Sequence, residues 1–383
     1  MALRSSLGGG EPDLRLGRKL LDINWGLVLL ICATASVGFA ILYSAAGGNL
    51  DPWASRQMVR FGGGLVLMLV VAMIDIRFWL RWAYPLYFVS ICLLVAVDLV
   101  GRIGMGAQRW LDLGLFQVQP SEIMKISLIL ALARYFHSLS DEETVRLRWL
   151  FVPAMMVALP MALVMKQPDL GTAMMLGLEG AALMFVGGVR IWVFLAGGAL
   201  AAASFPFAWH YLHDYQKKRI AIFLNPEQDP LGAGYHILQS KIALGSGGLF
   251  GKGFLEGTQS HLSFLPEKQT DFIFTTLAEE FGMVGGVALI GLYMLLVAYG
   301  YAIALRSRSQ FGRLVALGIA SMLFIYVFIN IAMVSGLLPV VGVPLPLVSY
   351  GGTAMLTLLM GFGLVMSVYI HRDVEIPRRG SLG

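Results

Sequence analysis

An aspartate stands where a polar segment of the sequence runs into an apolar one. Asp271 follows Glu267 and Lys268 and precedes the apolar run that begins at Phe272. A carboxylate partly withdrawn from water binds a proton more tightly, which suits a general base. The position also suits a helix N-cap, in which Thr270 or Asp271 accepts hydrogen bonds from the first amides of the helix. We predict that Asp271 is catalytic and that Glu267 is a second carboxylate or a solvated charge.

Two opposite charges lie three residues apart in an otherwise apolar stretch. Glu122 and Lys125 have the spacing that places both on one face of a helix. Inside a membrane each charge alone is unfavourable, so we expect the two to pair. The pair is either a structural lock between helices or one polar wall of a cavity, with Lys125 close to an anionic headgroup.

Three more charged residues lie in short connections. Arg109 stands beside Trp110, which is typical of an anchor at the membrane interface, although a guanidinium can also hold a phosphate through two hydrogen bonds. Lys166 and Asp169 flank a Gln-Pro turn. Asp169 is either the N-cap of the next helix or an interior partner of Lys166.

Composition places these residues in a membrane protein. The chain is 57% hydrophobic and 13% charged, whereas soluble domains carry about 25% charged residues. Apolar runs of about 20 residues, the length that crosses a bilayer, recur along the chain. We predict an all-α polytopic protein with ten transmembrane helices, near residues 24–46, 57–74, 79–99, 120–136, 150–164, 170–187, 191–209, 272–305, 314–335 and 347–370.

The distribution of Lys and Arg predicts the orientation of these spans. Sixteen of the 28 basic residues fall in segments on the N-terminal side of the membrane, and five fall in the short loops on the other side. Because basic loops stay in the cytoplasm, both termini are predicted to be cytoplasmic. The tails then cover residues 1–22 and 372–383, around one transmembrane domain over 23–371. A long extracytoplasmic loop, about 210–270, joins spans seven and eight, and loops of this length are usually functional.

The eighth predicted span is too long to cross the bilayer straight and carries Glu279 and Glu280 early. We expect its first two turns to lie outside the hydrocarbon or beside a cavity. A Pro- and Gly-rich link, residues 336–346, precedes the tenth span, which opens with Ser349 and small residues. Small residues permit close helix packing, and the free amides of a helix N-terminus can also face an anionic group.

Several classes of site are disfavoured. The net charge of +5 does not require nucleic acid, because membrane proteins collect basic residues on one side. No Gly-Lys-Ser/Thr ending marks a P-loop. Cys32 and Cys92 lie in apolar runs and suggest neither a disulfide nor a metal site. Four of the six histidines lie in the long loop without a metal-ligand spacing, namely His210, His213, His236 and His261.

Four motifs follow one another along nearly the whole chain. They are Pro120-Ser121-Glu122-x2-Lys125, Gln167-Pro168-Asp169-Leu170-Gly171, the block Gly245–Phe274 with Leu265-Pro266-Glu267-x3-Asp271, and Asn330-x5-Gly336-x2-Pro339-x2-Gly342 with Ser349-Tyr350-Gly351-Gly352. In this order they resemble the SEDS (shape, elongation, division and sporulation) family of bacterial cell-wall polymerases. The strings Gly106–Gly114 and Gly257-Thr258-Gln259-Ser260 are more similar to the elongation branch of the family than to the division branch.

The resemblance implies a peptidoglycan glycosyltransferase of the bacterial inner membrane with ten spans. Its substrate would be lipid II, and the essential acid of the family falls on Asp271. Its partner would be a class B penicillin-binding protein of the PBP2 type. Arg109, Lys125 and Lys268 are candidates to hold the undecaprenyl diphosphate that leaves, and a divalent cation, Mg or Mn, could share that task although no acidic cluster marks its site. The alternatives are a lipid II flippase, a division-type polymerase or a scaffold without activity.

Overall fold

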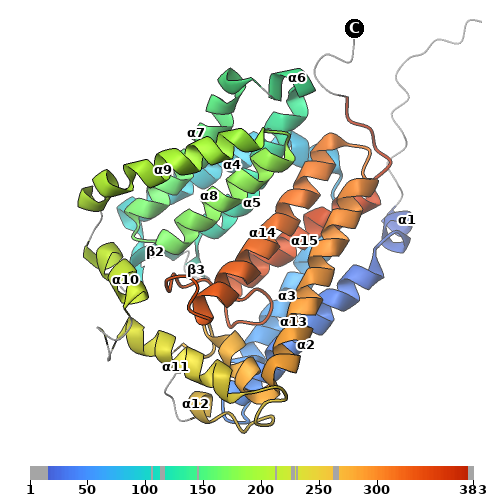
Figure 1. Cartoon of the computed structure of the whole chain (residues 1–383). Helices are drawn as coiled ribbons and strands as arrows, with labels where there is room; N and C mark the ends of the chain where they lie inside the picture. The colour runs from blue at the N-terminus through green and yellow to red at the C-terminus, as the bar shows by residue number, and fades with distance from the viewer. Residues whose placement is uncertain are drawn as a thin grey trace, which may run out of the picture.

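The computed structural model describes residues 16–104, 107–112, 117–144, 146–211, 214–225, 229, 232–261 and 267–377. Within these residues the chain is mostly helical (Figure 1). Most of both predicted tails, 1–15 and 378–383, lies outside the described residues, as do Gly106 and Gly114 of the first outer motif, Leu265 and Pro266, and His213.

A helix coincides with each of the ten predicted spans. These helices are α2 (Trp25–Ala45), α3 (Ala54–Met73), α4 (Ile76–Val100), α5 (Pro120–Ser138), α7 (Leu147–Lys166), α8 (Leu170–Val186), α9 (Ile191–Tyr211), α13 (Ile273–Arg306), α14 (Gln310–Val334) and α15 (Gly352–Ile370). Among the described residues, seven helices are long and apolar enough to cross a membrane: α2, α3, α4, α7, α13, α14 and α15. The protein is therefore a multi-pass membrane protein.

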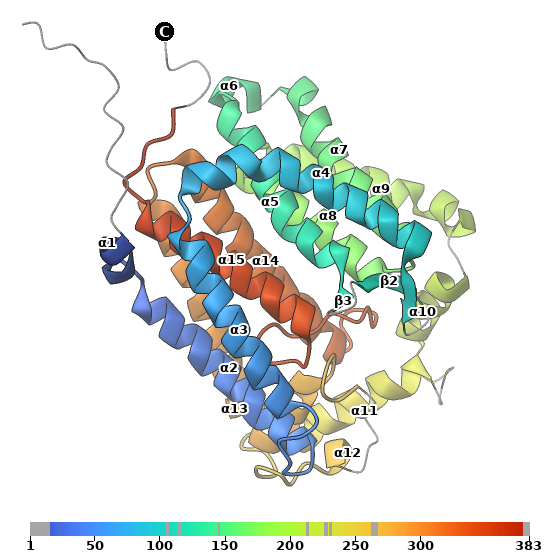
Figure 2. The same ribbon diagram turned by 180° about the vertical axis from the view of Figure 1, so that it is seen from behind.

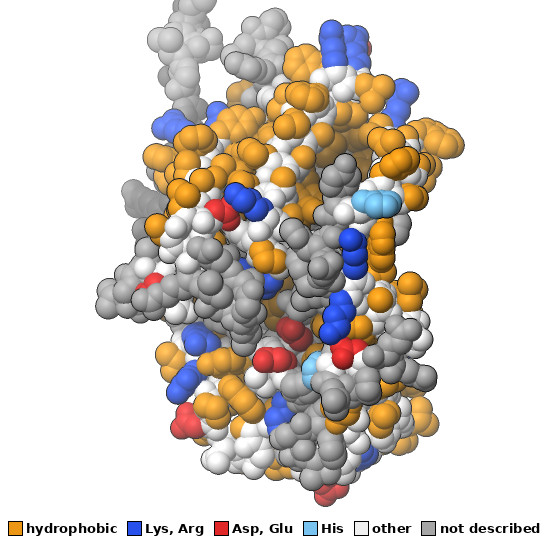
Figure 3. Space-filling model, turned by 90° about the vertical axis from the view of Figure 1, so that its left-hand side faces the viewer, with side chains coloured by type: hydrophobic (Ala, Val, Ile, Leu, Met, Phe, Trp, Pro, Cys, Tyr) orange, Lys and Arg blue, Asp and Glu red, His pale blue; other side chains and the backbone are white. Residues whose placement is uncertain are grey.

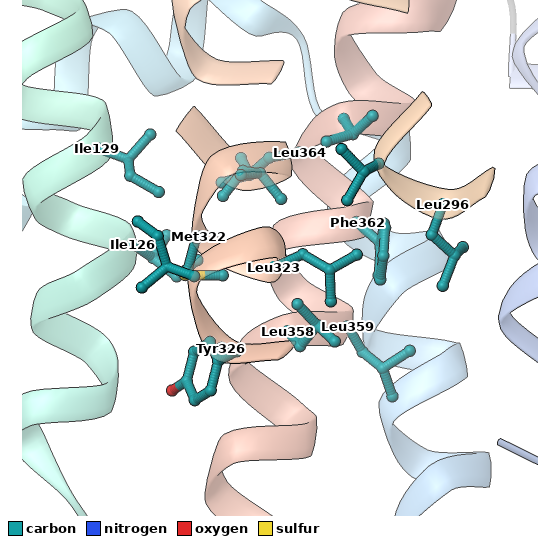
Figure 4. Close-up of a cluster of buried hydrophobic side chains, with 14 of the residues drawn as sticks. Ile126, Ile129, Leu296, Met322, Leu323, Tyr326, Leu358, Leu359, Phe362 and Leu364 are labelled. Atoms are coloured by element: carbon teal, nitrogen blue, oxygen red, sulfur yellow. The ribbon is translucent and has the colours of Figure 1, made fainter. Parts of the chain in front are cut away.

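Helices α14 and α15 form the centre of the bundle (Figures 1 and 2). Helices α2, α3 and α13 pack on one side of them, and α5 with α8 on the other, where α4, α7 and α9 lie further out. Figure 4 shows the core at this level, in which side chains of α5, α13, α14 and α15 interlock. Tyr326 belongs to this cluster, and its hydroxyl points toward α5. The central position of α14 makes it the element through which distant motifs meet.

The first outer connection contains a small sheet, which the prediction of an all-α protein did not include. Strands β1 (Arg102–Gly104), β2 (Ala107–Asp112) and β3 (Gln117–Val118) form an antiparallel sheet in the order β1-β2-β3. Glycines interrupt this stretch of sequence at Gly101, Gly104, Gly106 and Gly114. They disfavour a continuous helix and permit the tight turns of a hairpin.

The long loop predicted for residues 210–270 contains helices of its own. They are α10 (Asp214–Leu224), α11 (Ala233–Ser246) and the short α12 (Thr258–His261). Helix α11 packs against α13 and α14, and Ser240 donates a hydrogen bond to the carbonyl of Val334 at 2.8 Å. This region lies at one end of the bundle, whereas α1 (Leu16–Leu21), α6 (Asp141–Thr144) and the C-terminal tail lie at the other (Figure 1).

Helix α13 is broken at Gly282, where φ is +65°. The break leaves backbone groups of α13 without partners inside the helix, and the glycine-rich segment 247–253 forms hydrogen bonds with them. The amides of Lys252 and Gly253 donate to the carbonyls of Glu279 and Glu280 at 3.1 and 3.0 Å, and two amides beyond the break donate back to carbonyls of the segment at 2.9 and 3.1 Å. Only residues without a bulky Cβ allow two backbones to approach this closely.

Glu279 and Glu280, in the first two turns of α13, are both buried, with exposed fractions of 0% and 1%. Glu279 pairs with Lys252 at 2.7 Å, and Glu280 accepts a hydrogen bond from Ser44 of α2. A cation therefore compensates the charge of Glu279, whereas Glu280 receives a neutral hydroxyl donor from a segment far away in the sequence.

Candidate active site

Asp271 lies in a tight turn that leads into α13. The amide of Thr270 donates to the carbonyl of Glu267 at 3.0 Å, and Glu267 has a φ of +56°. The N-cap position of α13 belongs to Phe272, so Asp271 lies one residue before the cap. Its side chain is half-buried, the partial withdrawal from water that the sequence led us to expect for a general base.

Asn330 of α14 joins this turn to the Pro- and Gly-rich link. Its side-chain amide donates to the backbone carbonyl of Asp271 at 2.9 Å and to that of Val343 at 2.7 Å. The link returns close to the carboxylate, because a Cβ on Gly342 would lie 3.4 Å from Asp271 Oδ2. Gly342 has a φ of +71°, a conformation that glycine adopts without strain. One amide on α14 therefore fixes both segments that surround the aspartate.

Ser349 holds the other end of the link against the same turn. Its hydroxyl donates to the carbonyl of Thr270 at 2.6 Å and accepts from the amide of Leu345 at 2.7 Å. The amide of Tyr350 donates to the carbonyl of Gln269 at 2.8 Å. Ser349 is 4% exposed. Its hydroxyl is thus engaged with backbone groups, which makes it a positioning residue in this conformation.

Asp169 and Arg109 form an ion pair on another side of the candidate site. Asp169 caps α8, accepting from the amide of Thr172 at 3.1 Å and from its hydroxyl at 2.9 Å. Arg109 Nε lies 3.5 Å from Asp169 Oδ2, and its Nη2 donates to the carbonyl of Pro168 at 2.6 Å. The arginine side chain remains 31% exposed.

The α8 cap lies against the link that passes Asp271. A Cβ on Gly171 would lie 2.4 Å from the carbonyl oxygen of Val341, the residue before Gly342. The motif around Asp169, the turn around Asp271 and the link therefore converge at one place, although they are separated by up to about 180 residues in the sequence.

Glu122 and Lys125 pair as predicted, at 2.7 Å, and Tyr326 of α14 completes the group. The tyrosine hydroxyl is bonded to Lys125 and lies 3.2 Å from the nearer oxygen of Glu122. Lys125 is 1% exposed, so the ammonium lies inside the protein. Glu179 of α8 is 1% exposed and interacts electrostatically with both charges. Tyr326 lies four residues before Asn330, which places this group one helical turn from the Asp271 turn.

Three residues predicted to belong to the site lie apart from the place where the Asp169 motif, the Asp271 turn and the link meet, or at its rim. Lys166 pairs with Asp98 at 3.4 Å and is 75% exposed, so its partner is not Asp169. Glu267 is exposed and accepts a hydrogen bond from Thr270 at 2.9 Å. Lys268 is half-buried, and burial lowers the pKa of its ammonium. A lysine with a lowered pKa loses its charge at a lower pH than an exposed lysine.

The structure adds residues that sequence reasoning did not select. Gln57 of α3 donates to the carbonyl of Ser349 at 2.9 Å, and the guanidinium of Arg60 stacks on the ring of Tyr350 at 4.9 Å. Arg60 is a charge near the start of a predicted span, which is a signal of function that could have identified it. Tyr326 has no such signal, since an aromatic residue in an apolar helix is ordinary.

The described residues do not fit a protein-built metal site. Among them, no three His, Cys, Asp or Glu side chains gather closely enough to hold an ion. Figure 3 shows that hydrophobic side chains dominate the upper half of one face, with basic side chains at its top edge, and that acidic and basic side chains lie among hydrophobic ones in the lower half.

Comparison with known proteins places this geometry in a family. The model of the FtsW, RodA and SpoVE family, described as cell cycle proteins, matches residues 20–374. The chain belongs to this family. The similarity extends to a peptidoglycan glycosyltransferase, MrdB of Escherichia coli, which is 49% identical over 349 residues that cover 91% of this chain and 94% of the relative. Peptidoglycan glycosyltransferase RodA of Treponema pallidum is 33% identical and covers 92% of this chain and 98% of the relative.

Solved structures show the same fold. A chain from a study of how a peptidoglycan synthase complex coordinates polymerisation and cross-linking has a TM-score of 0.79, with 36% identity over 91% of this chain and 98% of that chain. The rod shape determining protein RodA of Thermus thermophilus has a TM-score of 0.69, with 33% identity over 92% of this chain and 98% of that chain.

Proposed function

We propose that the chain is an elongation-type peptidoglycan glycosyltransferase that polymerises lipid II in the bacterial inner membrane. The observation that carries this proposal is its 49% identity to MrdB, a peptidoglycan glycosyltransferase, over 91% of the chain. A second relative with this activity, RodA, aligns over 92% of the chain. The enzyme class follows from these relatives, and the roles of single residues follow from the local geometry.

Asp271 is the general base of the proposed reaction. Its carboxylate accepts the proton of the GlcNAc 4-hydroxyl of lipid II as that oxygen attacks the anomeric MurNAc carbon of the growing chain. The bond from that carbon to undecaprenyl diphosphate breaks, and the diphosphate leaves with inversion at carbon. This is the acid and base logic of an inverting glycosidase, with a sugar hydroxyl in place of water. The half-buried turn that Asn330 and Ser349 hold supports the role, because a base must be fixed near its proton.

Cations at the rim stabilise the leaving diphosphate. The side chain of Arg109 is 31% exposed beside the α8 cap, and Lys268 lies three residues before the base. Charge-assisted hydrogen bonds from such groups stabilise negative charge as it develops on the phosphate. Lys125 is enclosed with Glu122 and Tyr326, so we assign it the positioning of α5 against α14.

The remaining features of the proposal concern topology and partner. In the proposed topology, each of the ten helices that coincide with predicted spans crosses the membrane, and both termini face the cytoplasm, because basic residues concentrate at that side. The Asp271 turn and α11 then face outward. The likeness to a chain of a peptidoglycan synthase complex supports assembly with a class B penicillin-binding protein of the PBP2 type.

Polymerisation of labelled lipid II by the purified protein, with its cognate penicillin-binding protein, tests the proposal. Wild type should form long glycan strands, and Asp271→Asn should lose about 10²–10⁴-fold in rate, as expected for removal of a general base. Glu267→Gln, an exposed carboxylate of the same turn, is the matched control and should remain active. Full activity of Asp271→Asn would refute the base. Absence of polymer from wild type with its partner would instead favour lipid transport, for which a lipid II flipping assay is the next measurement.

A further inference from the structure

A basic cavity lies at the end of the bundle opposite the candidate active site. It measures about 560 Å³ between the beginning of α4 and the end of α5. Its wall includes three arginines, a histidine and two hydroxyl residues, namely Arg77, Arg81, Arg134, His137, Tyr84 and Ser138. Figure 2 shows that the beginning of α4 and the C-terminal tail lie at the same end of the molecule, and the tail contributes Pro377 to the wall. Among the residues that the structure describes, no carboxylate lines the cavity.

One of the arginines is held in place before any ligand arrives. Pro85 interrupts the hydrogen bonding of α4, because a proline has no amide proton to donate to the carbonyl four residues earlier. That carbonyl belongs to Arg81, and Arg134 of α5 supplies the missing donor through Nη1 at 2.8 Å. The guanidinium of Arg134 also lies 4.4 Å from the centre of the Tyr84 ring. A fixed arginine loses little freedom when it binds a ligand.

The other two arginines have charge that the described part of the chain does not compensate. Arg77 and Arg81 are exposed on one face of α4, four residues apart, and their side chains form no ion pair or hydrogen bond with any described residue. The nearest acid in sequence, Asp75, caps α4 through the amide of Arg77 and lies 4.0 Å from His371. Three like charges around one cavity repel one another, and an anion between them removes that repulsion.

Exposed aromatic side chains on the same turns of α4 as Arg77 and Arg81 suit a position at the surface of the bilayer. Phe78 and Trp82 are 45% and 47% exposed and lie beside each other on α4, with ring centres 6.0 Å apart. Tryptophan and tyrosine concentrate at the level of lipid headgroups. The cavity therefore combines guanidinium groups, which match a phosphate geometrically, with an apolar surface suited to acyl chains.

We propose that this cavity binds the phosphate headgroup of an anionic phospholipid, on the side of the membrane that we assign to the cytoplasm. Basic pockets between transmembrane helices on that side bind such headgroups. Arg134 forms the fixed floor, Arg77 and Arg81 close over the phosphate, and the acyl chains lie along Phe78 and Trp82. The site is separate from the polymerase site and does not depend on its chemistry.

Binding to purified full-length protein tests the proposal without any measurement of activity. The probes are nanodiscs of phosphatidylcholine with a trace of labelled phosphatidylglycerol, and the same system with inorganic phosphate at equal concentration. We expect Arg77→Gln/Arg81→Gln to reduce retention of phosphatidylglycerol by about tenfold, given the usual contribution of a basic residue at an anionic surface. Arg77→Lys/Arg81→Lys should lose less, since it keeps the charge but not the paired donors.

Arg190→Gln provides the matched control. Arg190 is an exposed arginine that precedes α9 and does not line the cavity, so its removal should leave lipid retention unchanged. An equal loss in this control would overturn the proposal in favour of general surface charge. Equal retention of phosphatidylcholine and phosphatidylglycerol by wild type would also overturn it. Displacement of the lipid by equimolar inorganic phosphate would overturn the lipid assignment. An unaltered thermal midpoint in detergent verifies that each variant is folded.

Discussion

Asn330 and Asp271 are joined by a hydrogen bond of 2.9 Å from the asparagine side chain to the aspartate backbone carbonyl. The same amide group also donates to Val343 at 2.7 Å. A single, fully buried side chain of α14 thus determines where the turn of Asp271 lies relative to the link that passes it. The proposed base is therefore positioned through its backbone by a residue 59 positions away.

Asn330→Ala should reduce the polymerisation rate while the protein still folds. Two backbone carbonyls lose their donor, which costs about 1–3 kcal/mol for each buried group left without a partner. Because the turn of Asp271 is then less well fixed, the rate at saturating lipid II should fall more than the affinity for lipid II. Rate and affinity measured separately check this, with Asn225→Ala, an exposed asparagine after α10, as the control. An equal fall in both quantities for the two variants would contradict the positioning role.

Lys125→Met should destabilise the protein strongly. The substitution leaves Glu122 buried beside Glu179 without the ammonium between them, and removal of one partner from a buried ion pair costs about 3–5 kcal/mol. The thermal midpoint in detergent should fall, and the double variant Glu122→Gln/Lys125→Met should recover part of the loss. Lys166→Met removes an exposed pair and should change stability by less than about 1 kcal/mol. Equal effects of Lys125→Met and Lys166→Met would refute the assignment.

Gly251→Ala should disrupt the break in α13. Its φ is +82°, and a Cβ there would lie 2.0 Å from the carbonyl oxygen of Glu280. We expect a loss of about 2–4 kcal/mol from strain and overlap. Gly197→Ala, where a Cβ in α9 would meet nothing within 4 Å, should be neutral or slightly stabilising because alanine favours helix. The thermal unfolding midpoints of both variants test this prediction. A Gly251→Ala protein as stable as wild type would contradict the close approach of residue 251 to α13.

The lowered pKa of Lys268 predicts a pH dependence. Burial disfavours the charged ammonium, so Lys268 becomes neutral at a lower pH than an ordinary lysine. If its charge helps to hold the diphosphate, polymerisation should decline on the alkaline side as that proton is lost. Lys268→Arg keeps the charge at all accessible pH values, so the decline in polymerisation rate should occur at a higher pH. Identical pH profiles for wild type and Lys268→Arg would remove Lys268 from the binding of diphosphate.

The burial of Lys268 also predicts that folding stability rises with pH, whereas the polymerisation rate is expected to fall. The folded state binds a proton at Lys268 less tightly than the unfolded state does, so the lysine favours the unfolded chain at pH values low enough to charge it there. This penalty disappears as the pH rises above the pKa of the unfolded chain. Lys268→Gln should therefore stabilise the protein at neutral pH, and Lys217→Gln, the same substitution on α10, serves as the comparison. Unfolding midpoints of the two variants at neutral and alkaline pH check this difference.

Local composition determined the helices of this protein. Long apolar runs need to bury their backbone groups in a bilayer, and a helix satisfies those groups within one segment. The positions of the ten long helices and the pairing of Glu122 with Lys125 therefore followed from residue types and spacing alone. Asp271 could be selected because a carboxylate at the end of an apolar run is unusual, and the family resemblance pointed to the same residue.

Tertiary packing decided which of these segments meet. The bonds of Asn330 to Asp271, of Tyr326 to Lys125 and of Ser44 to Glu280 join residues 59, 201 and 236 positions apart, and no local pattern encodes such separations. The strands β1–β3 and the helices within the long loop also depend on contacts outside their own sequence. Charges such as Glu279 and Glu280 could be placed only when their partners were known, because burial of a carboxylate is tolerated where a distant donor reaches it.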